Sequence, residues 1–283
     1  GIMCPHINLF VKIPTMAVGS GAERLSIGVA SSRLLAPEEF GTMIQVDLVA
    51  ETTKQAMADA GITRADQIHC VEVKCPAMTP ARIADAAGRG KTVVSGNPAA
   101  ASSMAKGACA LGVAVATGEV DRDALNDGSI NVEKQYFSSI ASTSAGGEQV
   151  ACRVVVIGNV AGSPSRFVAG HGMMKDQLDI AGARAAFADA GLDMTDGVLT
   201  DDSRARLAAC FVNAGADFAP DVRGRRHTIH SDFLNSFGGV QAKSVVHAIV
   251  ASIVGDTLLL ASAGAEHQGP PGANLICVIT EAA

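Results

Sequence analysis

Residues 142–148 read Ser-Thr-Ser-Ala-Gly-Gly-Glu, and the core of this motif returns at residues 262–266 as Ser-Ala-Gly-Ala-Glu. Each copy is followed by a short apolar run typical of a strand, at residues 152–159 and at residues 274–280. A small residue and a glycine after a serine allow a tight turn that leaves the hydroxyl and nearby N–H groups uncovered. Two such turns at matching places predict a site built by internal duplication.

The segments around the two motifs also recur in the same order. The recurring pairs are the helix ends 57–62 and 187–192, the strand ends at Lys74 and Asn213, and the alanine-rich helices 105–118 and 242–255. Both halves therefore read as helix, strand with a polar last residue, alanine-rich helix, serine turn and strand. Such self-similarity is the signature of repeated structural units.

This order predicts an α/β fold with two duplicated domains, at residues 14–160 and 161–283. Residues 7–13, Ile-Asn-Leu-Phe-Val-Lys-Ile, form a third apolar run of the kind that follows a serine turn, but no such turn precedes them. We therefore expect residues 1–13 to be the end strand of another repeat that is missing before residue 1.

The composition restricts the class of protein further. The 283 residues are 48% hydrophobic but only 4% aromatic, which predicts an aliphatic, alanine-rich core. A net charge of −6 without a basic run argues against a nucleic-acid partner. Seven cysteines without a CxxC pair favour reduced thiols in a cytoplasmic protein. We expect neither a signal peptide nor a membrane-spanning segment.

Polar residues recur at corresponding places in the two repeats: Lys74, Lys106 and Ser144 in one, and Asn213, Lys243 and Ser262 in the other. Serine is a poor nucleophile until a base takes its proton, and lysine can be that base when burial or a second cation favours its neutral amine. Lys74 ends an apolar strand, and Lys106 would supply the second cation. A dyad of Ser144 and Lys74 is therefore reasonable, with N–H groups near Ala145 holding the oxyanion.

The same residues also have purely structural interpretations. A lysine that ends a strand is commonly a solvated edge residue, and serines in glycine-rich turns commonly just form the turn. Lys106 and Lys243 lie in alanine-rich helices, where lysine side chains can extend along apolar surface to reach water. Spacing alone does not choose between these interpretations and a catalytic one.

At these residues the chain resembles the cyanuric acid hydrolase/barbiturase family of ring-opening amidohydrolases, through essentially all 283 residues. The resemblance is carried by residues 73–76, 110–112, 138–146, 225–228 and 265–270. It implies homologous α/β domains arranged with pseudo-threefold symmetry as a barrel-like assembly around the substrate, with the first repeat absent from this sequence. It also implies a homo-oligomer, a tetramer, and allows a companion chain that supplies the first repeat.

The resemblance implies roles for individual residues. Lys74 and Ser144 would be base and nucleophile, and no cofactor would take part in catalysis. The groups that would bind substrate are Lys106, Ala145, Lys243, Ser262 and Ala263. A structural divalent cation, Mg²⁺ or similar, would be held by carbonyl groups of Ala265, Gln268, Gly269, Pro270 and Ala273.

The chain departs from the family pattern at four of these places. Lys106 and Lys243 stand where hydrolases of cyanuric acid have arginine, and Asn213 replaces the lysine of the last domain. The metal-binding glutamate of relatives falls at Gly215, which argues against the metal.

The leading hypothesis is therefore hydrolysis of one C–N bond in a small cyclic ureide or imide through an acyl-enzyme on Ser144. Loss of the two arginines favours a substrate like barbituric acid, and cyanuric acid is the alternative. A non-catalytic protein or subunit that binds a cyclic ligand is an alternative of another class, favoured by Asn213 and Gly215 and opposed by the Lys74–Ser144 pair. An inactive fragment is a third possibility.

Overall fold

The computed structural model describes residues 2–13, 19, 21–215, 221–226 and 238–283. The chain divides into two compact units. The first unit comprises Ile27–Val156 together with the short segment Glu266–Pro270. The second unit comprises Gly1–Ser26, Ile157–Ala265 and Pro271–Ala283. One serine motif, at residue 144, therefore lies in the first unit and the other, at residue 262, in the second.

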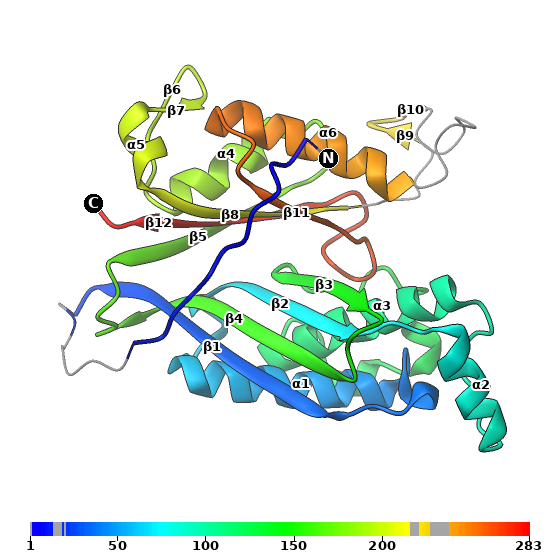
Figure 1. Ribbon diagram of the computed structural model, residues 1–283. Coiled ribbons are helices and arrows are strands. Elements are labelled where there is room, and N and C mark those ends of the chain that lie inside the picture. Colours follow the sequence, from blue (N-terminus) through cyan, green and yellow to red (C-terminus); the bar gives the residue numbers. More distant parts are fainter. Residues whose placement is uncertain (1, 14–18, 20, 216–220, 227–237) are drawn as a thin grey trace. The chain divides into compact units, whose positions relative to one another are not determined.

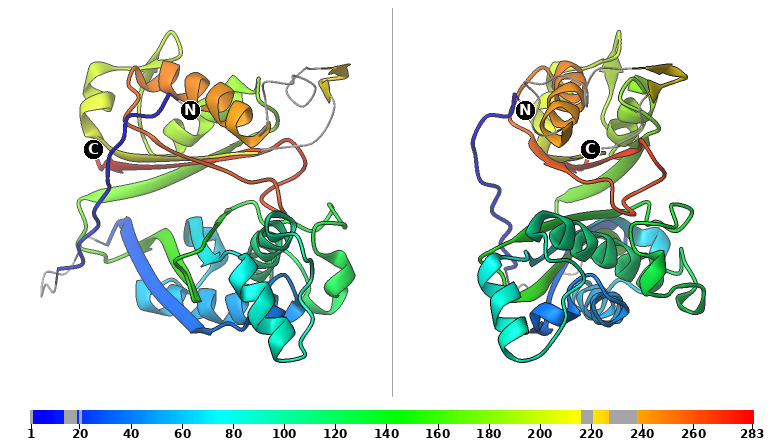
Figure 2. Two further views of the ribbon diagram at one scale, coloured as in Figure 1. Left: turned by 45° about the vertical axis from the view of Figure 1, so that its right-hand side comes forward. Right: turned by 90° about the vertical axis from the view of Figure 1, so that its right-hand side faces the viewer.

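The first unit is a four-stranded sheet with its helices on one face (Figures 1 and 2). In spatial order its strands are β1 (Glu23–Leu34), β4 (Ala151–Ala161), β2 (Ile68–Pro76) and β3 (Ala141–Gly146). Its helices are α1 (Met43–Ala60), α2 (Pro80–Gly88), α3 (Pro98–Thr117) and the short 3₁₀ turns η1 (Pro37–Glu39), η2 (Ala65–Gln67), η3 (Arg122–Ala124) and η4 (Asp127–Ser129). Helices α1 and α3 pack on each other and form the apolar layer under the sheet.

Local sequence signals set the ends of these helices. Asn97 caps α3, because its side chain accepts hydrogen bonds from the backbone N–H groups of Ala99 and Ala100. Helix α1 ends at Gly61, which adopts the left-handed conformation at φ 69° that favours glycine. Of the described helices, α3 alone is long and apolar enough to cross a membrane, but ten of its residues are buried against the sheet and α1, as in a core helix.

The second unit has the same plan. In spatial order its strands are β5 (Phe167–Met174), β12 (Asn274–Glu281), β8 (Leu207–Ala214) and β11 (Leu260–Ala263). Helices α4 (Ile180–Asp189) and α6 (Gly238–Val254) pack on this sheet (Figure 1), and α5 (Asp201–Arg206) precedes β8. Two short hairpins complete the unit, β6 (Met194–Thr195) with β7 (Val198–Leu199) and β9 (Asp221–Val222) with β10 (Arg225–Arg226).

Corresponding strands occupy the same places in the two sheets. The order β1-β4-β2-β3 in the first unit matches β5-β12-β8-β11 in the second. In both, the strand with a polar end residue pairs in parallel with the strand that carries the serine motif. The mixed α/β class predicted from the sequence is confirmed.

The apolar run at residues 7–13 joins no sheet, although the sequence predicted a strand there. A strand needs a hydrogen-bonded neighbour, and no described strand pairs with this run. Its side chains are left largely exposed, with Ile7 at 90% and Leu9 at 83%.

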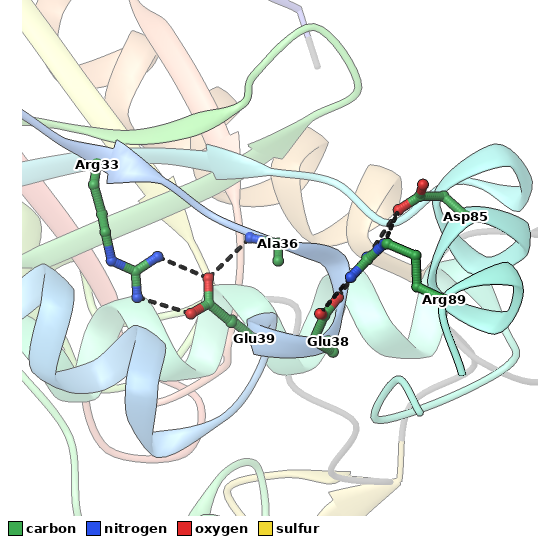
Figure 3. Close-up of polar contacts among 6 residues, drawn as sticks. All are labelled: Arg33, Ala36, Glu38, Glu39, Asp85 and Arg89. Atoms are coloured by element: carbon green, nitrogen blue, oxygen red, sulfur yellow. Dashed lines mark hydrogen bonds and ion pairs between the residues drawn. The ribbon is translucent and has the colours of Figure 1, made fainter. Parts of the chain in front are cut away.

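An ion-pair network holds the end of β1 beside α2 at the surface of the first unit (Figure 3). Arg33 donates two hydrogen bonds to the Glu39 carboxylate, at 2.8 and 2.7 Å. Arg89, directly after α2, donates to Glu38 in the same bidentate way, at 2.7 Å for each bond, and this lowers the pKa of Glu38 to about 2. Water and salt screen such exposed pairs, so they fix geometry more than they add stability.

Gly28 is where β1 crosses α1 most closely, and it gives a first prediction. A Cβ at Gly28 would lie 1.8 Å from the carbonyl oxygen of Ala56 and 2.7 Å from the nitrogen of Ala60, so strand and helix would have to separate. We expect Gly28→Ala to lower the free energy of unfolding by about 2 kcal/mol in urea titrations. Gly88→Ala is the control, because a Cβ at Gly88 meets no atom within 4 Å. Equal stability of the two variants would show that the crossing relaxes freely.

Candidate active site

The parallel pairing of β2 with β3 places Lys74 directly opposite Ser144. Side chains alternate between the faces of a strand, so the direction of the neighbours shows which face this is. Thr143 points toward α3, because its hydroxyl donates to the carbonyl oxygen of Lys106 at 3.2 Å. Cys75, next to Lys74, is fully buried and its thiol contacts Cys109 of α3. Lys74 and Ser144 therefore lie on the opposite face, away from the helices of their unit.

Four polar residues share this face of the two strands, and we call them the polar quartet: Glu72, Lys74, Ser142 and Ser144. They form two opposed pairs, because Glu72 is in register with Ser142 just as Lys74 is with Ser144. The corresponding positions of the second unit hold Phe211, Asn213, Leu260 and Ser262, with Phe211 opposite Leu260 and Asn213 opposite Ser262. The first unit therefore has a lysine–serine pair and a second polar pair that the second unit lacks.

Glu148, the last residue of the first serine motif, lies beside the lysine of the quartet. The Lys74 ammonium is 3.9 Å from its carboxylate, and the two side chains are 40% and 64% exposed. Hydrogen bonds from its own backbone N–H and from Gln149, with the charge of Lys74, lower the pKa of Glu148. Within the described chain Lys74 makes no hydrogen bond to Ser144. Catalytic hydrogen bonds are often long without substrate and shorten once it binds.

Glu72 is the residue of the quartet whose pKa is strongly shifted by its surroundings. Burial raises its pKa to about 7, and hydrogen bonds from Ser142 and Cys70 only partly offset this effect. An ordinary glutamate is already mostly ionised at a pH about two units below this value. At neutral pH a large share of Glu72 is therefore a neutral carboxyl.

The raised pKa of Glu72 predicts a loss of stability as pH rises from acidic to neutral. Its pKa is raised from 4.5 in the unfolded chain to about 7 in the fold, so stability is fully present below pH 4.5 and is lost as pH rises to 7. Glu72→Gln removes this titration. Between pH 5 and pH 8.5, we expect the free energy of unfolding of the variant to rise by about 2 kcal/mol relative to that of the wild type, a figure that allows for the partial exposure of Glu72. Urea unfolding at each pH measures this difference. A difference that is constant with pH would contradict the assignment.

Lys106 does not present a free ammonium in this structure. Its Nζ lies 2.7 Å from Oε1 of Glu266, and both side chains are largely buried, at 21% and 14% exposure. Ser103 donates to the same carboxylate oxygen at 2.8 Å. Burial acts to raise the pKa of Glu266, but the charge and hydrogen bond of Lys106 outweigh it, so the pKa is lowered. The sequence predicted a substrate contact for Lys106; here it is one half of an internal ion pair.

The segment 266–270 is fixed to the first unit at further points. Nε2 of His267 accepts from the N–H of Asn131 at 2.7 Å, so its proton is on Nδ1, which contacts the carbonyl oxygen of Tyr136 at 2.5 Å. This neutral tautomer fits the pKa of His267, which burial lowers. Gln268 accepts the N–H of Thr143 at 2.7 Å, directly before Ser144. The segment therefore supports the strand that carries the serine.

The metal predicted for this loop does not fit the described side chains. Its five expected ligands, Ala265, Gln268, Gly269, Pro270 and Ala273, would offer only carbonyl oxygens, so the site would lack the carboxylate that usually joins such oxygens around Mg²⁺ or Ca²⁺. A Cβ at Gly215 would lie 2.3 Å from the carbonyl oxygen of Ala273, so an acidic side chain there would require these two segments to move apart. The Glu266 carboxylate is committed to Lys106.

The remaining predicted residues lie in the second unit. Ser262 is opposite Asn213, and Ala263 follows it on β11. Lys243 is partly buried on α6, where it lies close enough to His247 for its charge to add to the effect of burial in lowering the pKa of that histidine. Ala145 follows Ser144 on β3, opposite Cys75.

A family model described as amidohydrolase ring-opening protein matches residues 1–281. The chain belongs to this ring-opening amidohydrolase family. A cyclic amide hydrolase of Azorhizobium caulinodans is 40% identical over 282 residues, which are 100% of this chain and 76% of that protein. Barbiturase 1 of a Nocardioides species is 37% identical, over 99% of this chain and 76% of its own length.

A comparison with solved structures leads to the same family. One described as cyanuric acid hydrolase superposes with a TM-score of 0.88 at 38% identity, covering 96% of this chain and 72% of that one. A cyanuric acid amidohydrolase of Pseudomonas sp. strain ADP is 38% identical over 100% of this chain and 76% of its own length. The family's members thus include enzymes named for each of the two substrates weighed above.

Three acidic residues near the site escaped the sequence reasoning, although each of them carried a signal. Glu148 and Glu266 end the two copies of the Ser-Ala-Gly-x-Glu motif, and each lies against a lysine of the first unit. The repetition of the acid, like that of the serine, was the available clue. For Glu72, the clue was its place two residues before Lys74, which puts both side chains on one face of a strand.

Proposed function

We propose that this ring-opening amidohydrolase cleaves one C–N bond of a small cyclic ureide or imide, with Ser144 as the nucleophile and Lys74 as its base. The Lys74 amine takes the hydroxyl proton while the serine oxygen attacks a ring carbonyl carbon. The N–H of Ala145 holds the oxyanion. The C–N bond then breaks, the proton passes to the leaving nitrogen, and water hydrolyses the acyl-enzyme to release the ring-opened acid.

The observation that carries this proposal is the register of β2 and β3. It brings a lysine and a serine from segments 70 positions apart in sequence onto opposite positions of one strand pair. The Glu148 carboxylate lies beside this pair, 3.9 Å from the Lys74 ammonium.

For the substrate, we propose a ring like barbituric acid, with cyanuric acid as the alternative. A lysine at position 106 or 243 cannot make the two parallel hydrogen bonds that an arginine offers a ring carbonyl. Lys106 is also engaged by Glu266, so the substrate-binding groups that remain from the resemblance are Ala145, Lys243, Ser262 and Ala263. Hydrolases named for cyanuric acid and a barbiturase resemble this chain to similar degrees, 38% and 37% identity, so identity does not choose between them.

The proposal extends to the assembly. The matching strand orders of the two units support repeated α/β domains of one plan, and the family resemblance extends this to a pseudo-threefold assembly with one further repeat. The exposed apolar run at residues 7–13 supports a partner for it, either that repeat or a companion chain. A cytoplasmic homo-oligomer, a tetramer by family resemblance, completes this proposal.

The test is a ring-opening assay of the purified chain with barbituric acid and with cyanuric acid, run with intact mass and size analysis. Turnover of either compound supports the proposal, and the higher kcat/KM identifies the substrate. A folded sample that binds a cyclic amide but turns over neither would favour the binding-protein alternative, for which the asparagine opposite Ser262 is the structural argument.

A further inference from the structure

The second polar pair of the quartet, Glu72 opposite Ser142, is not demanded by the fold. The second unit builds the same strand pair with Phe211 opposite Leu260 at these positions. Apolar side chains therefore suffice there for the sheet to form. A carboxyl that is partly buried on a strand costs free energy, so its presence beside Lys74 calls for a role.

The surroundings of Glu72 leave hydrogen-bonding capacity unused. Ser142 and Cys70 hydrogen-bond to its carboxyl. Among the described residues no arginine or lysine forms an ion pair with Glu72. The charged groups on or beside this face include Lys74 on the same strand and Glu148, whose carboxylate is 3.9 Å from the Lys74 ammonium. By alternation they also include the exposed Arg153 on β4 and Arg33 on β1, which is paired with Glu39. Because burial raises the pKa of Glu72 to about 7, its carboxyl carries a proton in much of the population at neutral pH.

A neutral carboxyl donates one hydrogen bond and accepts another, side by side. The edge of a cyclic ureide presents the complementary pair, a ring N–H beside a C=O. Two residues of a strand are about 6.6 Å apart along its axis, so a ring that reaches Lys74 and Ser144 lies within reach of Glu72.

We propose that Glu72, held by Ser142, is a substrate-binding residue that pairs with an N–H/C=O edge of the ring while Ser144 attacks a ring carbonyl. This inference rests on the proposed function and adds the residue that selects for a ureide edge. An ionised Glu72 cannot donate to the ring carbonyl and repels the anion that acidic ureides form. Binding therefore requires the protonated form.

The experiment compares two variants of the whole chain with the wild type, using whichever of barbituric and cyanuric acid is turned over. Glutamine keeps one donor and one acceptor in the shape of a neutral carboxyl, whereas leucine keeps neither. We expect Glu72→Gln to retain KM within about threefold at pH 6 and Glu72→Leu to raise KM at least about tenfold. Changes in kcat should be smaller than those in KM.

The pH dependence separates binding from a purely structural role. The wild-type KM divided by the Glu72→Gln KM should rise about tenfold from pH 6 to pH 8, because only the wild type loses its proton. Titration of the substrate cancels in this ratio. Glu51→Leu, on the exposed side of α1, is the control and should leave KM unchanged.

A ratio of the two KM values that does not change with pH, or a wild-type KM in Glu72→Leu, would overturn the inference about Glu72. The proposed function would still stand in that case, because the wild type turns over its substrate. Binding without turnover is measured by calorimetry in Ser144→Ala. If the wild type turns over neither ureide and this variant binds neither, both the inference about Glu72 and the proposed function are wrong. Thermal unfolding of each variant shows whether a change in KM reflects binding or loss of the fold.

Discussion

Ser144→Ala is expected to lower kcat for ring opening by at least about 10³-fold while KM and the free energy of unfolding stay close to the wild type. Alanine removes the attacking oxygen but keeps the strand and its neighbours. The partly buried hydroxyl makes no hydrogen bond that the described structure would lose. Steady-state assays with barbituric and cyanuric acids measure the effect, and calorimetry measures retained binding.

Ser262→Ala is the matched control, because it truncates the serine at the equivalent position of the second unit. Its partner there is Asn213, an amide that cannot act as a general base. If one lysine–serine pair performs the chemistry, Ser262→Ala raises KM but leaves kcat within about tenfold of the wild type. Equal losses of kcat in the two variants would mean that the duplicated serines share the chemistry, which would refute the assignment to Ser144.

The duplicated fold was predictable from the sequence because the motif order is local information. Each helix and strand carries its own pattern, and the two serine turns mark equivalent positions. What the sequence did not contain is which strands become neighbours. The register that sets Lys74 opposite Ser144, and Glu72 opposite Ser142, arises from pairing over a long sequence separation. Such pairing depends on how whole units pack, not on local propensity.

The place of segment 266–270 shows the same limit. Repeat logic assigns Glu266 to the second of the two duplicated domains, whereas the structure groups this segment with the first unit. The acid of one serine motif therefore meets a lysine of the other repeat, Lys106. The family resemblance implied a substrate contact for that lysine. It could not show that a carboxylate 160 residues further along the chain engages the ammonium.

The polar quartet shows what comparison of the repeats adds. In the sequence, Lys74 is distinguished by its place at the end of an apolar strand. Nothing comparable distinguishes Glu72 from the other charged residues unless the strand register is known. Once the register is known, the equivalent positions Phe211 and Leu260 show that the Glu72–Ser142 pair is specific to one unit. Internal duplication thus supplies a control that a single-copy fold does not offer.

Lys106→Met tests whether the ion pair with Glu266 supports the fold or binds substrate. Methionine keeps the length and apolar stem of the side chain but leaves the carboxylate of Glu266 buried without its cation. Removing one partner of a buried pair costs about 3–5 kcal/mol, and partial exposure moves this pair toward the lower figure. We expect the free energy of unfolding to fall by about 3 kcal/mol at pH 8 in urea titrations.

The pH dependence and the second variant make this expectation specific. Without Lys106, burial is the largest effect on Glu266 and raises its folded pKa above 4.5, so the destabilisation should shrink as pH falls toward 4.5 and the carboxyl becomes neutral. Adding Glu266→Gln removes the unpaired charge, so the double variant should be more stable than Lys106→Met alone at pH 8. A substrate-binding lysine predicts the opposite pattern, a raised KM with unchanged stability. Because Gln268 of the same segment holds the N–H of Thr143 beside Ser144, loosening the segment should lower kcat more than it raises KM.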